Sequence, residues 1–88
     1  MRIAWQKDGL GYWTATIGNI TLCASPDRVR YGKPVRGTKW HAGVSSWDEA
    51  SRTISRFGRD VYGDLCDSAK EAMRLAELVY NDALREAA

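Results

Sequence analysis

Few side chains in this sequence could carry out acid–base or nucleophilic chemistry. There is one histidine, His41, and there are two thiols, Cys23 and Cys66. A catalytic nucleophile needs a base within hydrogen-bonding reach, and nothing in the spacing of these residues requires a thiol to meet the imidazole. We therefore predict that the chain is not an enzyme and that His41 is an ordinary residue of a strand.

Three aspartates are the candidate metal ligands. Asp60, Asp64 and Asp67 recur at i, i+4 and i+7, a spacing that would place three carboxylates on one helical face for Mg²⁺. Acidic residues also gather at helix N-termini, because the macrodipole and the free N–H groups favour negative charge there. Gly63 weakens any helix that would align the three side chains. We therefore expect no metal site and no cofactor.

The hydropathy and the cysteines bear on the compartment. No segment approaches the ~18 consecutive apolar residues of a membrane span, and the chain turns polar by Gln6, without the apolar core of a signal peptide. We expect a cytoplasmic protein with no membrane contact. In that reducing compartment Cys23 and Cys66 are predicted to be small buried side chains and not a disulfide.

Charge is distributed unevenly along the 88 residues, although the net charge is only +2. Residues 28–59 carry eight basic and two acidic side chains, whereas residues 60–88 carry three basic and seven acidic ones. Trp40 and Trp47 also lie in the basic segment. The candidate partner-binding residues all come from it: Arg28, Arg30, Tyr31, Lys33, Arg36, Lys39, Arg52 and Arg56.

Basic side chains interleaved with aromatic rings have three interpretations. They hold phosphates and stack on bases in proteins that bind nucleic acid. They serve equally well against an acidic protein surface. They also occur in solvated loops, where they keep a small protein apart from its neighbours. The sequence leaves these alternatives open.

The first half of the chain is typical of an antiparallel sheet. Strands are predicted over 3–6, 12–17 and 20–24, joined by turns at the Asp-Gly of positions 8 and 9 and at the Gly-Asn of positions 18 and 19. Alternation places the apolar residues of the second and third strands on one face. The polar segment 27–38, which contains Gly and Pro, is predicted to be an exposed loop, and alternation over 39–45 indicates a fourth strand.

The segment 47–57 has two interpretations. Helix signals come from Ser and Glu at the capping-box spacing and from apolar residues at i, i+4 and i+7: Ser46, Glu49, Ala50, Ile54 and Phe57. The competing interpretation makes residues 52–57 a fifth strand. We favour the short helix.

The last third of the chain is predicted to be a long amphipathic helix that begins near Asp67 or Ser68. Its apolar side chains recur at helical period and form one buried stripe: Ala69, Ala72, Met73, Ala76, Val79, Tyr80, Ala83 and Leu84. Leu75 lies on the flank of this stripe and Leu78 on the opposite side. Together the elements predict a single α+β domain, in which a three- to four-stranded antiparallel sheet, meander first, packs against the helix.

This order of elements resembles that of small uncharacterised phage and prophage proteins, among them anti-CRISPR and other anti-defence inhibitors. The likeness rests on the Trp-rich meander and on residues 67–73, Asp-Ser-Ala-Lys-Glu-Ala-Met, which lead into the alanine-rich helix. The chain also resembles small β-β-β-α antitoxin-like domains, from which its basic insertion departs. The resemblance implies a stoichiometric binder that acts without turnover.

We therefore expect a non-enzymatic inhibitor, encoded by a phage or another mobile element, that docks on a host protein or ribonucleoprotein such as a CRISPR defence complex. The alternative is a small nucleic-acid-binding module that uses the basic 28–59 region. A homodimer is a further option, because Leu75 and Leu78 lie outside the buried stripe.

Overall fold

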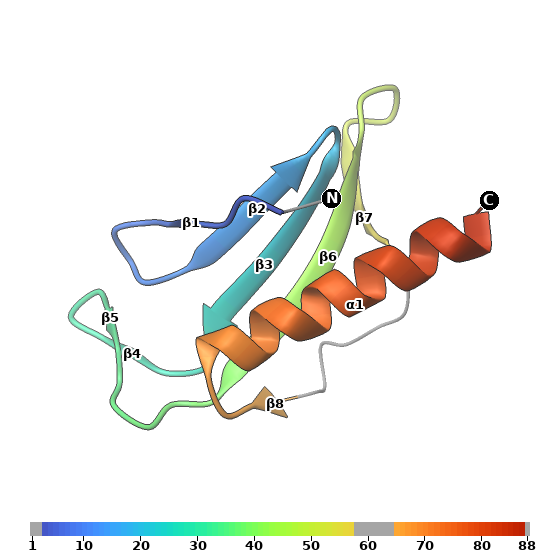
Figure 1. Ribbon diagram of the computed structural model, residues 1–88. Helices are drawn as coiled ribbons and strands as arrows, with labels where there is room; N and C mark the ends of the chain where they lie inside the picture. Colours follow the sequence, from blue (N-terminus) through green and yellow to red (C-terminus); the bar gives the residue numbers. More distant parts are fainter. Residues whose placement is uncertain (1–2, 58–64, 88) are drawn as a thin grey trace.

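The computed structural model describes residues 3–57 and 65–87, and it shows the α+β domain that the sequence predicts, with one long helix lying across an antiparallel sheet (Figure 1). The elements are β1 (Gln6–Lys7), β2 (Trp13–Ile17), β3 (Ile20–Pro26), β4 (Val29–Arg30), β5 (Lys33–Pro34), β6 (Trp40–Asp48), β7 (Thr53–Arg56), β8 (Leu65–Cys66) and α1 (Ala69–Ala87).

The main sheet has the order β1-β2-β3-β6-β7, and β8 pairs with the start of β6. The predicted meander is confirmed, and Gly18, with φ 61°, closes the two-residue turn between β2 and β3. The first strand is shorter and later than predicted. Asp8 Oδ1 accepts the N–H groups of Leu10 and Tyr12, which holds residues 8–12 in a loop and limits the pairing to β1.

The segment 47–57 forms a β-hairpin, so the short helix that we favoured is wrong. β6 continues to Asp48 and β7 pairs back onto it, which confirms the alternative strand over 52–57. Asp48 closes the turn, since its Oδ1 accepts the N–H of Ala50 at 3.0 Å and its Oδ2 accepts the hydroxyl of Ser51 at 2.8 Å. These side-chain bonds compete with the first turn of a helix.

The polar segment 27–38 contains a second hairpin, so the prediction of an irregular loop is wrong in part. β4 and β5 pair in a register that places Arg30 opposite Lys33. Between them φ is 53° at Tyr31 and 74° at Gly32, the two positive values that a type I′ turn requires. Most of the segment is exposed, as predicted.

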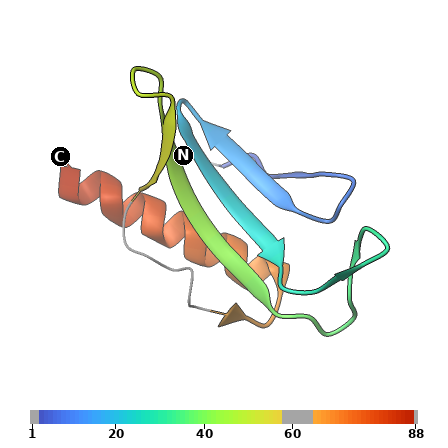
Figure 2. The same cartoon turned by 180° about the vertical axis from the view of Figure 1, so that it is seen from behind.

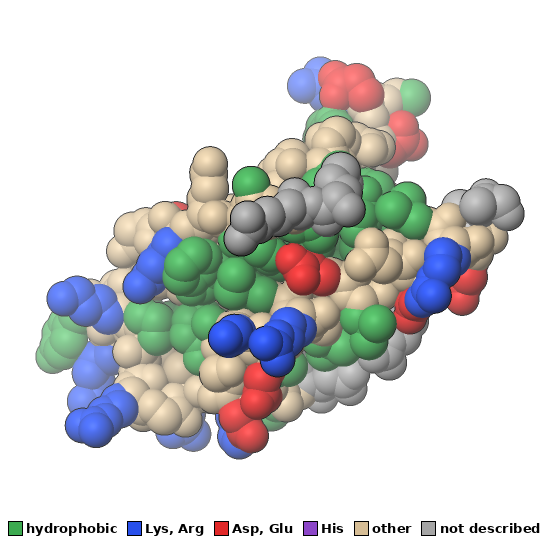
Figure 3. Space-filling view, in the orientation of Figure 1, with side chains coloured by type: hydrophobic (Ala, Val, Ile, Leu, Met, Phe, Trp, Pro, Cys, Tyr) green, Lys and Arg blue, Asp and Glu red, His purple; other side chains and the backbone are tan. Residues whose placement is uncertain are grey.

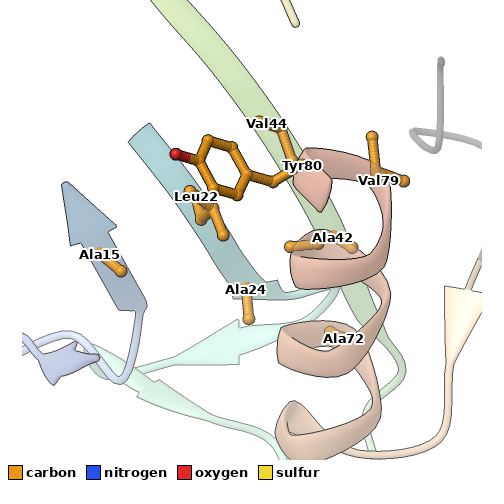
Figure 4. Packing of buried hydrophobic residues seen from close by; sticks show 9 residues of the cluster. Ala15, Leu22, Ala24, Ala42, Val44, Ala72, Val79 and Tyr80 are labelled. Atoms are coloured by element: carbon orange, nitrogen blue, oxygen red, sulfur yellow. The ribbon is translucent and has the colours of Figure 1, made fainter. Parts of the chain in front are cut away.

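The core lies between the sheet and one face of α1, and small residues dominate it (Figure 4). Leu22 and Val79 are the largest fully buried side chains, and Tyr80 is also buried. Val44 and five alanines complete the set, and the small side chains let the helix approach the strands closely: Ala15, Ala24, Ala42, Ala72 and Ala76.

Two predictions about the buried apolar stripe of the helix need correction. Met73 is only partly buried at the edge of the core, and Leu84 is 42% exposed. The last turns of α1 extend past the strands in Figures 1 and 2, which agrees with the exposure of Leu84 near the end of the helix. The exposure of Leu78 on the outer side of the helix is confirmed, and the partly buried Leu75 packs against the core.

The start of α1 is fixed by the predicted cap. Ser68 Oγ accepts the N–H of Glu71 at 3.2 Å, and Glu71 Oε2 in turn accepts the N–H of Asp67 at 3.1 Å. The first bond satisfies an N–H group that the helix itself leaves unpaired, and the second ties the residue before the cap to the first turn. Within the described ranges no helix has both the length and the apolar character needed to cross a membrane.

The other face of the sheet carries no helix or strand from the described part of the chain (Figure 2). Alternation along β2, β3 and β6 gives this face mainly small hydroxyl side chains, among them Thr14, Thr16, Thr21, Ser25 and Ser45. Cys23 and His41 belong to the same face, so His41 is a strand residue, as predicted.

Candidate binding surface

Residues 28–36, which contain β4 and β5, form a projecting unit that we call the basic hairpin. Its base is closed by the N–H of Val35, which donates to the carbonyl of Arg28 at 3.0 Å. The N–H of Arg28 donates to Thr38 Oγ1 at 2.9 Å, and Thr38 is buried. The carbonyl of Val35 accepts the N–H of Thr38 at 3.0 Å, so both ends of the hairpin bond to this buried residue and the tip has a defined orientation relative to the sheet.

The basic hairpin leans against the loop between β1 and β2. Gly11, with φ 85°, lies so close to β5 that a Cβ at this position would come within 2.7 Å of the Pro34 ring. Leu10 in the same loop approaches Gly32, where a Cβ would lie 3.7 Å from Leu10 Cδ2. The loop and the hairpin therefore form one surface, although they are about twenty residues apart in the chain.

The tip of this surface is unusually rich in exposed apolar groups. Tyr31 is 96% exposed, and Leu10 and Val29 are 55% and 43% exposed. A shallow pocket of about 420 Å³ lies beside the tip, between the 7–11 loop and residues 32–34. These features present an aromatic ring and aliphatic side chains next to a depression.

Basic side chains surround the apolar tip. Figure 3 shows them gathered at the end of the molecule that holds β4 and β5. The five that belong to the hairpin and the adjoining β1 are Lys7, Arg28, Arg30, Lys33 and Arg36. The two nearby carboxylates are already engaged, since Asp8 holds its own loop and Asp27 Oδ1 lies 2.8 Å from His41 Nε2. Five cationic side chains against these two carboxylates give this end of the molecule a net positive charge.

Lys39 lies at the base of the basic hairpin, where it lines a pocket of about 230 Å³ together with Arg28 and Arg36. Its ammonium group forms an ion pair with Asp67, at the start of α1. The hydrogen bond and the charge of Asp67 raise the pKa of Lys39, and the same contact lowers the pKa of Asp67. The pair is exposed to solvent, so it contributes little to the stability of the fold. A partner that binds Lys39 would have to compete with Asp67 for the ammonium group.

Arg52 and Arg56 lie away from the basic hairpin. Arg52 is in the β6–β7 turn, at the opposite end of a molecule that is 40 Å long, and acidic residues at positions 48 and 49 precede it in the same turn. Arg56 lies opposite Ser45 on the edge strand β7. The structure thus brings Arg28, Arg30, Tyr31, Lys33 and Arg36 together in the basic hairpin and places Lys39 at its base, whereas Arg52 and Arg56 lie elsewhere.

Among the candidate catalytic groups, Cys23 and His41 share the uncovered face of the sheet, whereas Cys66 lies opposite Trp40 and packs against the core. Cys23 lies opposite Gly43, and Ser25 lies opposite His41. Burial raises the pKa of the Cys23 thiol, an effect only partly offset by a hydrogen bond to Ser25. A higher pKa reduces the thiolate fraction, which is the reverse of what a nucleophilic cysteine requires. Both cysteines are free.

The described residues give little support to a metal site built on Asp60, Asp64 and Asp67. Asp67 pairs with Lys39, whereas Asp60 and Asp64 lie outside the described residues. Over the ranges 3–57 and 65–87, no three histidine, cysteine or acidic side chains converge as metal ligands would.

Sequence reasoning missed the contribution of Lys7, Leu10 and Val29 to the basic end. The position of Leu10 between two glycines is a local signal of an exposed apolar tip, but its proximity to the hairpin follows from the packing of Gly11 on Pro34. No pattern in either segment predicts that contact.

Comparison of the chain with protein-family models, with curated proteins and with solved structures gives no match. The resemblance to small phage proteins therefore stays a prediction.

Proposed function

We propose that this chain is a non-enzymatic binding protein that docks through the basic hairpin on an acidic surface of a host protein or ribonucleoprotein. The observation that supports the proposal most directly is Tyr31, which a type I′ turn holds at 96% exposure between Arg30 and Lys33. Tyrosine and arginine are the residues on which protein interfaces most often depend for affinity.

The apolar neighbours of Tyr31 favour a protein partner over a nucleic acid. Leu10 and Val29 are exposed on the same surface of loop and hairpin, and covering aliphatic side chains with a protein surface is favourable. Phosphate groups and base edges are polar, so they bury these aliphatic side chains much less favourably. The basic rim then steers the approach and selects acidic partners.

The resemblance to phage proteins suggests the biological setting. In the cytoplasm of an infected cell, the chain would act stoichiometrically, by covering an acidic surface that a defence complex such as a CRISPR effector needs. Binding of this kind requires no catalytic group in the inhibitor.

Direct binding of nucleic acid is the second candidate function. It draws support from Tyr31 itself, because an exposed ring flanked by cationic side chains can stack on an unpaired base. Such binding would weaken steeply with salt as counterions are released.

The test compares two variants with the same change in net charge. Arg30→Glu/Lys33→Glu reverses the rim of the hairpin, and Arg52→Glu/Lys70→Glu reverses two exposed charges elsewhere. Each protein is immobilised and exposed to an extract of host cells, with and without nuclease, and bound proteins are quantified by mass spectrometry.

We expect a defined protein to be retained by the wild type and by the Arg52→Glu/Lys70→Glu control after nuclease treatment. Its binding to the hairpin variant should be at least roughly tenfold weaker, about 1.4 kcal/mol. Equal retention by both variants would refute the hairpin as the docking site. Loss of all retention after nuclease treatment would favour the nucleic-acid function instead.

A further inference from the structure

Five residues form a straight line along the outer side of α1, and we call them the helix stripe: Glu71, Arg74, Leu78, Asp82 and Arg85. At 3.6 residues per turn, each lies within about 40° of Leu78 around the helix axis. Leu78 is 51% exposed, and the stripe lies opposite the alanines that contact the sheet.

The charges of the helix stripe alternate symmetrically about Leu78. Read from the N-terminal end, the order is acidic, basic, leucine, acidic, basic. If a second copy of α1 runs antiparallel with its Leu78 against the first, Glu71 faces Arg85 and Arg74 faces Asp82. Each of these attractions occurs twice, because a two-fold axis repeats every contact. In a parallel arrangement each charge would meet its own copy and repel it.

We propose that two copies of this chain associate through their helix stripes, as an isologous antiparallel pair of α1 helices centred on Leu78. Leu75, which is half-buried on the flank, adds apolar surface next to Leu78. Figure 3 views this side of the molecule, where charged groups of both signs lie along α1.

The contacts within one chain are compatible with this pairing. Arg85 Nη2 donates to Asp82 Oδ1 one turn earlier, and Glu71 Oε2 accepts the N–H of Asp67. A guanidinium group has five N–H donors, so Arg85 can keep Asp82 and still donate to Glu71 of the second copy. Neither carboxylate has to lose a partner when the dimer forms.

The size of the stripe sets the strength of the dimer. It spans about 21 Å of helix, at 1.5 Å per residue, and it has one central apolar side chain. An interface of this kind is smaller than the roughly 800 Å² per partner of a standard stable complex. The association is therefore weak, depends on protein concentration and decreases with added salt. It does not involve the basic hairpin and is independent of the proposed docking function.

Sedimentation equilibrium at low salt, up to about 1 mM protein where weak dimers populate, tests the proposal through a charge exchange. Arg74→Glu places two carboxylates opposite each other on both sides of the two-fold axis and should weaken dimerisation at least about tenfold. Arg74→Glu/Asp82→Arg restores the attraction and should restore the dimer. Lys33→Glu, which changes the net charge by the same amount outside α1, is the matched control and should leave dimerisation nearly unchanged.

The double variant also excludes an effect within the helix. It places like charges at i and i+3 twice in each chain, between positions 71 and 74 and between 82 and 85, which disfavours the isolated helix. Recovery of the dimer must therefore come from contacts between chains. Circular dichroism verifies that each variant is folded, and Leu78→Asp, at an exposed position, gives a second route to dissociation.

Three results would overturn the proposal: a wild-type protein that stays monomeric throughout, an Arg74→Glu effect no larger than that of Lys33→Glu, or a folded double variant that does not recover. A dimer that survives Leu78→Asp would also place the contact elsewhere.

Discussion

Trp5 and Glu77 are joined by a hydrogen bond in which the indole Nε1 donates to Oε1 at 2.9 Å, although the two residues are 72 positions apart. The bond connects the segment before β1 to the middle of α1. Trp5 also packs at the edge of the core, so the contact combines a polar anchor with apolar burial.

We expect Trp5→Phe to lower the free energy of unfolding by about 1–3 kcal/mol, because it leaves the partly buried Glu77 carboxylate without its donor and removes part of the ring. Glu77→Gln keeps an acceptor for the indole and should cost less. Thermal or urea denaturation gives both values, and equal losses would show that the hydrogen bond contributes little.

The centre of the core should be the most sensitive place for a truncation. Leu22 is fully buried between β2, β6 and α1, so Leu22→Ala should cost about 2–5 kcal/mol through lost burial and a residual cavity. Leu84→Ala makes the same chemical change at a side chain that is 42% exposed, and it should cost much less. Urea midpoints compare the two variants directly. Similar losses would contradict the assigned core.

The fold was predictable from the sequence where one face of a strand is buried. Alternation in β2, β3 and β6 follows from that one-sided burial, and the helix period of α1 follows from its packing on the sheet. The hairpin at 47–57 was not predictable by the same rule. Ile54 is 71% exposed and faces Trp47 on the uncovered side, so the apolar residue that suggested a helix is not a core residue at all.

The candidate surface was predictable in composition but not in extent. The charges of residues 28–36 are evident in the sequence, and the Tyr-Gly pair at 31 and 32 is a hairpin signal that the polar context obscured. The extent of the surface depends on contacts between residues that are far apart in the sequence. Lys39 meets Asp67 across 28 positions, and the β6–β7 turn carries Arg52 to the far end of the sheet.

Stability at acid pH should depend on Asp48. Hydrogen bonds from Ser51 and from the N–H of Ala50 lower the pKa of this carboxyl from its ordinary value of 3.8. A lowered pKa in the folded state means that the ionised form stabilises the β6–β7 turn above about pH 4. That contribution is lost as the pH falls through the folded-state pKa.

Asp48→Asn should therefore flatten part of the decrease in melting temperature between about pH 5 and pH 2, where a native carboxylate takes up its proton. At neutral pH the variant should be slightly less stable than the wild type, because an amide accepts these bonds more weakly. Melting curves measured at each pH show whether the two profiles converge in acid. Parallel profiles would mean that Asp48 does not link folding to pH.

The orientation of the basic hairpin should depend on the conformation of Tyr31 and not on its ring. Tyr31→Asn removes the ring but retains a residue that adopts positive φ readily, whereas Tyr31→Val places a β-branched side chain at φ 53°. The β-branched side chain adds up to about 1–2 kcal/mol to the strain that the tyrosine already carries, so the hairpin should open up to roughly thirty times more often. The N–H of Val35, which donates to the carbonyl of Arg28 at the base, reports this opening by hydrogen exchange.

We expect fast exchange in Tyr31→Val and wild-type exchange in Tyr31→Asn, with the same melting temperature for both because the hairpin lies outside the core. If the two variants exchange alike, the turn does not hold the hairpin in place, and the exposed ring would have no fixed position from which to meet a partner.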